Sequence, residues 1–242
     1  IRYIQDPVTG EGLFTSFGGT IEASCLIIVP ELINLLNHGG FLTVKEFMAL
    51  RQWFSKFLTW LKDSVPGNDA RMCRNNHAAW FCAYAGYAAV LAGNNESIAE
   101  ILGGFLPSCL KKQIRKDGAQ PEELQRPASF GYTMFSLTAF CDATLLVRQY
   151  APDLFSSNTA QNALLRQGID FVLPYCLGEA EWGYPDLHGA KRNGAVPVFA
   201  AAYYLWEDER YRKAIRNCMG VEPEKDNCGQ GNDYLYRLLY SV

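Results

Sequence analysis

The sequence predicts an all-α protein built as an array of paired helices. Apolar residues mostly recur at the spacing of a helix face, and strand-like alternation of polar and apolar residues is scarce. Short and medium loops join the candidate helices, which favours antiparallel neighbours. With 49% hydrophobic residues and no internal linker, the 242 residues can bury one large core. We therefore expect a single domain over residues 1–242.

The first half of the chain contains four candidate helices. The first covers Glu22 to Asn37 and ends near a Gly-Gly pair that suits a C-cap. Thr43 suits the N-cap of the second, Val44 to Ser64, which should stop at the Pro-Gly step that follows. The third, Asn76 to Ala92, is rich in small residues and suited to close packing, and the fourth covers Ser97 to Arg115.

The second half repeats this pattern after a turn at residues 116–121. The expected helices are Phe130 to Tyr150, Ala160 to Leu173, the pair Val196 to Trp206 and Asp208 to Cys218, and a short tail helix from Asp233 to Tyr240. Pro174 is expected to close the helix that precedes it. Residues 178–194 form a long stretch rich in Gly, Trp and Tyr, which we expect to be an irregular loop.

Composition excludes several function classes. The net charge of −3 provides no basic field for nucleic acid or for an anionic membrane. No uninterrupted apolar run reaches the roughly 18 residues of a membrane span, and no signal-peptide h-region opens the chain. The three histidines are scattered and no Cys-x-x-Cys pair occurs, so we expect no metal site and no cofactor.

The cysteines and a sequon favour an extracellular protein. Cys218 and Cys228 flank a polar segment with the spacing of a loop-closing disulfide, whereas Cys82 and Cys141 lie in apolar helical patterns and read as buried thiols. Asn95 begins an N-glycosylation sequon in a Gly/Asn-rich turn. Together with a start that lacks Met, these features predict a secreted glycoprotein in mature or trimmed form.

Two amides and an imidazole, Asn75, Asn76 and His77, stand at the mouth of the apolar run that begins at Trp80. A buried amide without a partner costs roughly 1–3 kcal/mol for each unsatisfied group. Something polar should therefore meet these side chains, and our hypothesis is an acidic sugar. Taken singly, the asparagines could simply cap the third helix, and the histidine could be a surface or core residue.

Two further stretches combine charged or aromatic side chains with turns. Arg126 supplies a planar cation suited to a carboxylate, and Tyr132 supplies a phenol on an emerging helix. Trp182, Tyr184 and His188 lie in a loop with the composition of a sugar-binding segment. Each of these residues also has a structural alternative. Arg126 could be an ordinary surface cation and Tyr132 a core residue. The rings of Trp182 and Tyr184 could simply fill the core, and His188 could be a loop residue without a role in binding.

Taken together, these motifs resemble the alginate lyase superfamily of polysaccharide lyases. The resemblance covers most of the chain and rests on an ordered series: Asn75-Asn76-His77-x-x-Trp80, Asp117-Gly118-x-x-Pro121-x-Glu123-Leu124-x-Arg126, Tyr132, and the segments 168–175 and 182–186. It implies an incomplete (α/α) toroid of antiparallel helix hairpins. It also implies a cleft in which an acidic polysaccharide, a polyuronate, is cleaved by β-elimination.

The resemblance implies a catalytic role for four residues. Asn76 and Arg126 would bind the uronate carboxylate and stabilise the enolate-like charge, and one such donor contributes roughly 2.7–4 kcal/mol in comparable oxyanion sites. Either His77 or Tyr132 would take the C5 proton, and Tyr132 would protonate the departing glycosidic oxygen. The side chains expected to contact substrate are Asn75, Trp80, Trp182, Tyr184, His188 and Arg192, the last at a uronate several units from the cut.

Two features depart from the family pattern. Family members carry a further N-terminal part of the domain, so we expect a cleaved segment or a second chain to supply it. Mannuronate lyases often place a histidine beside the tyrosine, where this chain has Thr133 and Met134. Glucuronan is therefore as admissible a substrate as alginate or mannuronan.

Two other functions also fit the sequence. A toroidal glycoside hydrolase needs two carboxylates roughly 5–9.5 Å apart, and the candidates are Glu123, Glu179, Glu181 and Asp186. A non-catalytic protein could keep the lyase scaffold for carbohydrate binding or for assembly with another subunit. Unsaturated products would separate the lyase from both.

Overall fold

The computed structural model describes residues 17–157, 159–187 and 189–220. Its elements are η2 (Phe17–Leu26), α1 (Ile28–His38), α2 (Val44–Asp63), α3 (Val65–Met72), α4 (Asn76–Ala92), α5 (Asn95–Ile98), η3 (Ala99–Phe105), α6 (Leu106–Gln113), α7 (Pro121–Leu124), α8 (Ser129–Tyr150), α9 (Pro152–Ser157), α10 (Thr159–Cys176), η4 (Arg192–Ala195), α11 (Val196–Trp206) and α12 (Glu209–Met219). Over these residues no strand forms, and β pairing is limited to an isolated bridge between Ala128 and Asp186. The predicted all-α class is confirmed.

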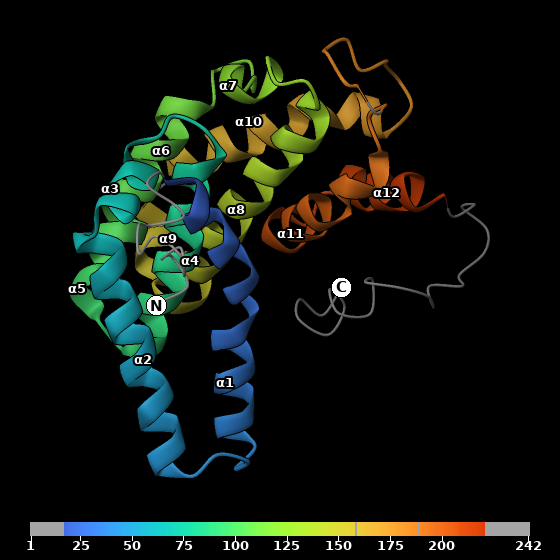
Figure 1. The fold of residues 1–242 in the computed structure, drawn as a ribbon. Helices are drawn as coiled ribbons and strands as arrows, with labels where there is room; N and C mark the ends of the chain where they lie inside the picture. Colours follow the sequence, from blue (N-terminus) through green and yellow to red (C-terminus); the bar gives the residue numbers. More distant parts are fainter. Residues whose placement is uncertain (1–16, 158, 188, 221–242) are drawn as a thin grey trace.

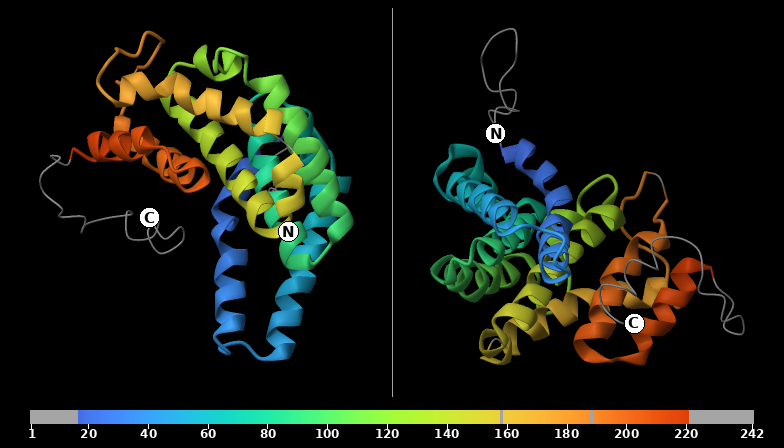
Figure 2. Two further views of the ribbon diagram at one scale, coloured as in Figure 1. Left: turned by 180° about the vertical axis from the view of Figure 1, so that it is seen from behind. Right: turned by 90° about the horizontal axis from the view of Figure 1, so that it is seen from below.

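The helices pack side by side in a curved array that leaves one side open (Figures 1 and 2). At its centre α4 packs against α8, with α2 on the other side of α4 and α11 against α8. Helix α12, the last one in the described part of the chain, packs on α11 and also contacts α10. In Figure 1, α1 and α2 extend together at one end of the molecule, and α7 lies at the opposite end beside the start of α8.

The core is centred on α4 because this helix is apolar or small around its whole circumference. Fourteen of its 17 residues are buried, so it must be covered on every side. Gly86 allows the closest approach: a Cβ there would lie 2.8 Å from Leu102 Cδ2 in the neighbouring η3 segment. The small residues that predicted close packing therefore do bring a second element against α4.

Several expected boundaries are confirmed. The third expected helix matches α4 at both ends, and α8, α11 and α12 each start within one residue of the expected position. Thr43 caps α2 as expected, in a reciprocal arrangement: its Oγ1 accepts from the Glu46 backbone N–H at 3.3 Å, and Glu46 Oε2 accepts from the Thr43 backbone N–H at 2.9 Å.

Other boundaries are wrong for local reasons. The helix expected at 22–37 is a 3-10 segment, η2, followed by α1, and the one expected at 97–115 divides into α5, the π-helical η3 and α6. By contrast, α2 stops before the Pro-Gly step as expected, and a further helix, α3, starts there, because Ser64 Oγ accepts from the Gly67 backbone N–H at 3.2 Å and proline suits a first turn.

Pro174 does not close its helix, since α10 continues to Cys176. In the last turn a proline removes only one of the remaining backbone bonds, which the helix end tolerates. The tail helix expected at 233–240 lies outside the described residues. By length and composition α8 could cross a membrane, but 78% of its most apolar window is buried inside the protein, as in a core helix.

Candidate active site

The first turn of α4 presents Asn76 and His77. The helix begins there because Asn75 caps it: Asn75 Oδ1 accepts a hydrogen bond from the His77 backbone N–H at 3.2 Å. Asn76 is buried and His77 is half-buried. Asn75, expected to contact substrate, is thus occupied as the helix cap, which was the structural alternative for this residue.

Glu123, in α7, holds Asn76 in place. Its Oε1 accepts from the Asn76 backbone N–H at 2.5 Å, and the Asn76 Nδ2 donates to Oε1 at 3.1 Å and to Oε2 at 3.0 Å. Burial raises the pKa of the Glu123 carboxyl, an effect that the Asn76 hydrogen bonds and the nearby Arg126 charge oppose. The Asn76 amide is therefore oriented with its nitrogen toward α7.

Arg126 and Tyr132 lie face to face. The guanidinium carbon of Arg126 is 4.3 Å from the centroid of the Tyr132 ring, a close cation–π stack. The short connection between α7 and α8 carries Arg126, and Tyr132 is on the first turn of α8. Arg126 Nε is buried and has no hydrogen-bond partner among the described residues.

The charge of Arg126 also reaches His77. Burial lowers the pKa of the His77 imidazole below its ordinary value, and the Arg126 cation lowers it further. The imidazole is therefore neutral at neutral pH and can accept a proton. Through Glu123 and Arg126, the start of α4 and the α7–α8 connection thus bring together Asn76, His77, Arg126 and Tyr132. We call these four residues the central cluster.

The predicted sugar-binding loop docks on the start of α8. Ser129 donates its backbone N–H to Pro185 O at 3.1 Å, and the Phe130 backbone N–H donates to Asp186 Oδ2 at 3.1 Å. Trp182 Nε1 donates to Ser129 Oγ at 2.8 Å, and its ring lies 5.2 Å from that of Phe130. The loop that carries Trp182 and Tyr184 therefore contacts the segment that carries Arg126 and Tyr132, at the start of α8.

The other residues expected to contact substrate occupy different settings. Trp80 is buried against Phe135, with ring centroids 4.8 Å apart, and so belongs to the core. Tyr184 is 40% exposed beside Trp182, and Arg192 is exposed above the Tyr175 ring at 4.7 Å. His188 lies outside the described residues.

A pocket of about 500 Å³ opens at the start of α8, and the residues that line it do not include Tyr132 or the other members of the central cluster. It lies between the first turns of α8 and the loop before η4, and its lining includes Gly131 and Phe135, which flank Tyr132 along the helix. Lys191 and Asn193 add polar groups to its wall. A pocket of this size can hold only a few sugar rings, so it would accommodate a short part of a polymer.

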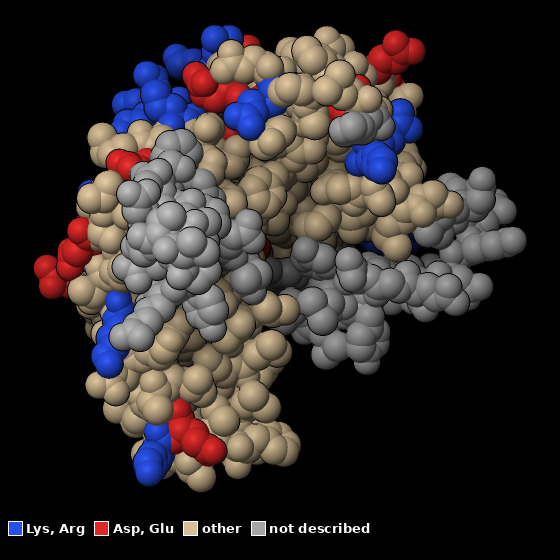
Figure 3. Space-filling model, viewed as in Figure 1, with Lys and Arg blue, Asp and Glu red and all other residues tan. Residues whose placement is uncertain are grey.

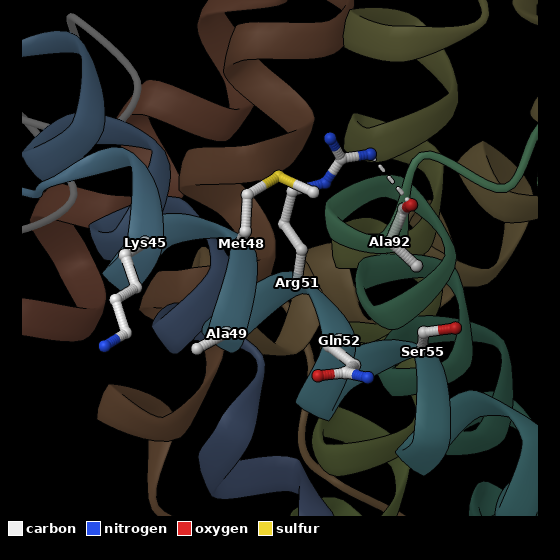
Figure 4. A pocket seen from close by; sticks show the side chains of 7 residues that line it. All are labelled: Lys45, Met48, Ala49, Arg51, Gln52, Ser55 and Ala92. Atoms are coloured by element: carbon white, nitrogen blue, oxygen red, sulfur yellow. Dashed lines mark hydrogen bonds between the residues drawn. The ribbon is translucent and has the colours of Figure 1, made fainter.

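A second pocket, of about 610 Å³, lies at the other end of α4 (Figure 4). There Arg51 of α2 donates to Leu91 O and to Ala92 O, both at 2.9 Å. The guanidinium thus satisfies carbonyls that the end of α4 leaves unpaired. We assign Arg51 a structural role, since the residues with proton-transfer chemistry are at the opposite end of the helix.

The carboxylates that a hydrolase would need are engaged elsewhere. Glu123 accepts hydrogen bonds from Asn76, and Asp186 accepts one from the Phe130 backbone N–H in the first turn of α8. Glu179 Oε1 lies 3.8 Å from Lys213 Nζ. Glu181 is exposed in the loop. Across the described part of the chain, no group of three His, Cys, Asp or Glu side chains could hold a metal ion.

Two predictions concern covalent modification. Asn95 is exposed at the start of α5, whereas the Ser97 of its sequon is buried and accepts a hydrogen bond from Lys62 Nζ at 3.2 Å. Cys218 is a buried thiol of α12. Its expected disulfide partner, Cys228, lies outside the described residues.

Glu123 is the residue whose role sequence reasoning missed. It stood in the quoted motif and was considered only as a hydrolase carboxylate. The signal was its place three residues before Arg126, which puts both side chains in one short turn beside Asn76. Only the fold shows that the α4 N-terminus arrives at that turn.

Comparison with known proteins identifies one family and a similar structure. The sequence model of the family described as alginate lyase matches residues 11–182. The fold is similar to the crystal structure of an alginate lyase from Bacteroides ovatus, with a TM-score of 0.79 and 20% sequence identity. That alignment covers 100% of this chain and 62% of the other. No significant match was found among curated proteins. The structural likeness supports the toroidal arrangement of the helices.

Proposed function

Because this chain belongs to the alginate lyase family, we propose that it is a polysaccharide lyase that cleaves a polyuronate by β-elimination. The observation that carries the proposal is the central cluster, in which a neutral imidazole, a phenol, a guanidinium and an amide lie at the junction of α4, α7 and α8. This set supplies a base, an acid and carboxylate donors without a metal.

The uronate carboxylate is the first requirement of the reaction. The C5 proton is weakly acidic while the adjacent carboxylate keeps its full charge, so that charge must be stabilised. Arg126 offers the unpaired Nε–H and a fixed positive charge. Asn76, oriented by Glu123, offers an amide beside it. Preorganised donors of this kind act most strongly on charge that grows in the transition state.

Proton transfer follows from the two remaining groups. In our proposal neutral His77 takes the C5 proton, the C–H electrons form the C4–C5 double bond, and the C4–O bond breaks. The Tyr132 hydroxyl then protonates the departing glycosidic oxygen. The imidazolium returns its proton to solvent and the phenolate regains one, so the enzyme is restored. Arg126, stacked on Tyr132, stabilises the transient phenolate.

The substrate is an acidic polymer, and the proposal leaves alginate, mannuronan and glucuronan as candidates. Lys and Arg side chains gather along the upper edge of the face in Figure 3, where α6 and α7 lie, and the last turn of α6 carries Lys111 and Lys112. These cations lie at the same end of the molecule as α7. Because a polymer of this kind is encountered outside the cell, we propose an extracellular site of action, in keeping with the exposed Asn95.

The test is a panel of polymers with ultraviolet detection. Each of alginate, mannuronan, glucuronan and a glycosaminoglycan is incubated with the protein, and absorbance of the new C4–C5 double bond is followed. A neutral glucan serves as the control, because it lacks the carboxylate. We expect a rise with at least one polyuronate and none with the glucan. No rise with any acidic polymer contradicts the proposal.

A further inference from the structure

The thiols of Cys176 and Cys218, on different helices, lie next to each other where the predicted sugar-binding loop begins. Cys176 is the last residue of α10, and Cys218 lies in the last turn of α12. Their side chains are within hydrogen-bond reach of each other, and both are buried. In the structure each is a free thiol. Two cysteines that are distant in sequence and whose side chains meet in the fold are candidates for a disulfide.

Two further contacts join the segments on either side of this cysteine pair. Asn217, which precedes Cys218, donates its side-chain Nδ2 to the carbonyl of Leu177, which follows Cys176, at 3.1 Å. Two residues further along the loop, Glu179 lies 3.8 Å from Lys213 of α12. These contacts hold the end of α10 against α12 independently of the thiols.

We propose that Cys176 and Cys218 form a disulfide in the mature protein, and that this disulfide anchors the loop that carries Trp182 to α12. The loop leaves α10 directly after Cys176 and returns at η4. With its first end fixed, the loop keeps Trp182 against Ser129 and Phe130 at the start of α8. The inference does not depend on the proposed lyase activity.

The oxidation is ordinary thiol–disulfide exchange with a small-molecule disulfide such as oxidised glutathione. The hydrogen bond from Cys176, together with the Arg192 cation, lowers the pKa of the Cys218 thiol, which makes Cys218 the first nucleophile. Its thiolate attacks the glutathione disulfide and releases one glutathione thiolate. Cys176 then loses its proton and attacks the mixed disulfide at the Cys218 sulfur, which releases the second glutathione. Two thiols are oxidised and one disulfide is reduced.

This assignment competes with the pairing expected from sequence, because Cys218 can form one disulfide only. The two pairings are separable by peptide mapping. Trypsin cuts after Lys and Arg, so Cys176 falls in peptide 167–191, Cys218 in 217–225 and Cys228 in 226–237. A bond to Cys176 links 167–191 with 217–225, whereas a bond to Cys228 links 217–225 with 226–237.

The experiment uses the full chain secreted from a eukaryotic host. Free thiols are blocked with N-ethylmaleimide under denaturing, non-reducing conditions before digestion and mass spectrometry. We expect the 167–191 peptide linked to 217–225, and its loss after reduction. Linkage of 217–225 to 226–237, or alkylation of both Cys176 and Cys218, overturns the proposal.

A second measurement tests the anchor. Hydrogen exchange over residues 178–187 is compared between the wild type, the double variant Cys176→Ser/Cys218→Ser, and Cys141→Ala, in which a buried thiol of α8 is removed. We expect exchange in this segment to be at least roughly tenfold faster in the double variant and unchanged in the control. If the double variant does not fold, the wild type is measured after mild reduction. Equal exchange before and after removal of the bond contradicts the anchoring role.

Discussion

The buried carboxylate of Glu123 accepts three hydrogen bonds from Asn76, one from its backbone N–H and two from its side-chain amide. The carboxylate therefore caps the first turn of α4 and orients the amide at the same time. It also lies near Arg126, whose charge affects its titration. One side chain thus fixes the relative position of two members of the central cluster.

Replacing Glu123 with glutamine should disturb this arrangement without removing the side chain. The Gln Nε2 is a donor, and it would face the Asn76 Nδ2, which is also a donor. We expect kcat on the active polyuronate to fall by roughly 10–100-fold, because a misplacement of about 1 Å in a donor has an effect of that order. Steady-state kinetics with separate kcat and KM provide the measurement.

Glu122→Gln is the matched control for this variant. Glu122 is the neighbouring carboxylate, exposed, and its Oε2 accepts from Gln125 Nε2 at 2.9 Å. Its replacement should leave kcat unchanged. Equal losses in both variants, or a normal kcat in Glu123→Gln, would show that Glu123 does not position Asn76 for the reaction.

Tyr132→Phe removes the hydroxyl that we assign to the leaving group and keeps the ring that stacks on Arg126. We expect kcat to fall by about 10²–10⁴-fold, the usual contribution of a general acid, with little change in thermal stability. Arg148 and Tyr204 form a similar stack at 4.7 Å, far along α8 from the site. Tyr204→Phe should therefore keep full activity. A Tyr132→Phe variant that retains wild-type kcat contradicts the assignment.

The pKa of His77 should depend on Arg126. Burial is the larger cause of its lowered pKa and the Arg126 charge is the smaller. In Arg126→Gln the imidazole should titrate at higher pH than in the wild type, while still below its ordinary range because it remains half-buried. NMR titration of the three histidine imidazoles measures this, with His77→Asn to assign the resonance. A midpoint unmoved by the loss of the cation would place His77 away from Arg126.

Asp142, buried in α8, should make stability depend on pH. Burial raises its pKa from 3.8 to about 7, so the folded state holds this proton more tightly than the unfolded chain. Between those pH values unfolding releases the proton, and stability falls as pH rises. Asp142→Asn removes the effect, so it should stabilise the protein at pH ~8, by up to roughly 4 kcal/mol at about 1.4 kcal/mol per pKa unit.

Urea unfolding at acidic and at mildly alkaline pH measures this difference. The gain from Asp142→Asn should be close to zero near pH ~2.5, where the Asp142 carboxyl is protonated in both the folded and the unfolded state. Asp153→Asn, at an exposed position of α9, is the control and should change neither value. A variant that is destabilised equally at both pH values would indicate a lost hydrogen bond and not a buried charge.

Long periodic segments were predictable from sequence, and interrupted ones were not. The apolar run of α4 and the Thr43 cap of α2 identify their helices, because the local signal agrees with the packing. The segment at 97–115 reads as one helix, yet its two central glycines and Pro107 divide it. Local pattern alone does not show where a helix turns to follow its neighbour.

The candidate site shows the same division. The order of the motifs predicts the four residues of the central cluster, and the fold brings them to one junction, while their catalytic role stays a prediction. Trp80 was expected at the substrate and is buried against Phe135, since its place in α4 faces α8. The contact between Glu123 and Asn76 was not predicted, because it joins residues that are 47 positions apart in the chain. Contacts between segments of this kind are set by tertiary packing.

The most direct test of the central claim is the mass of the products formed in ¹⁸O-labelled water. Elimination by the central cluster breaks the C4–O bond without adding water, so the new end should be unsaturated, one water lighter than a hydrolysis product and free of ¹⁸O. Hydrolysis would instead place ¹⁸O in a saturated product. We predict unlabelled, unsaturated fragments from the wild type and far fewer of them from Tyr132→Phe in the same time, whereas labelled, saturated fragments would contradict the account.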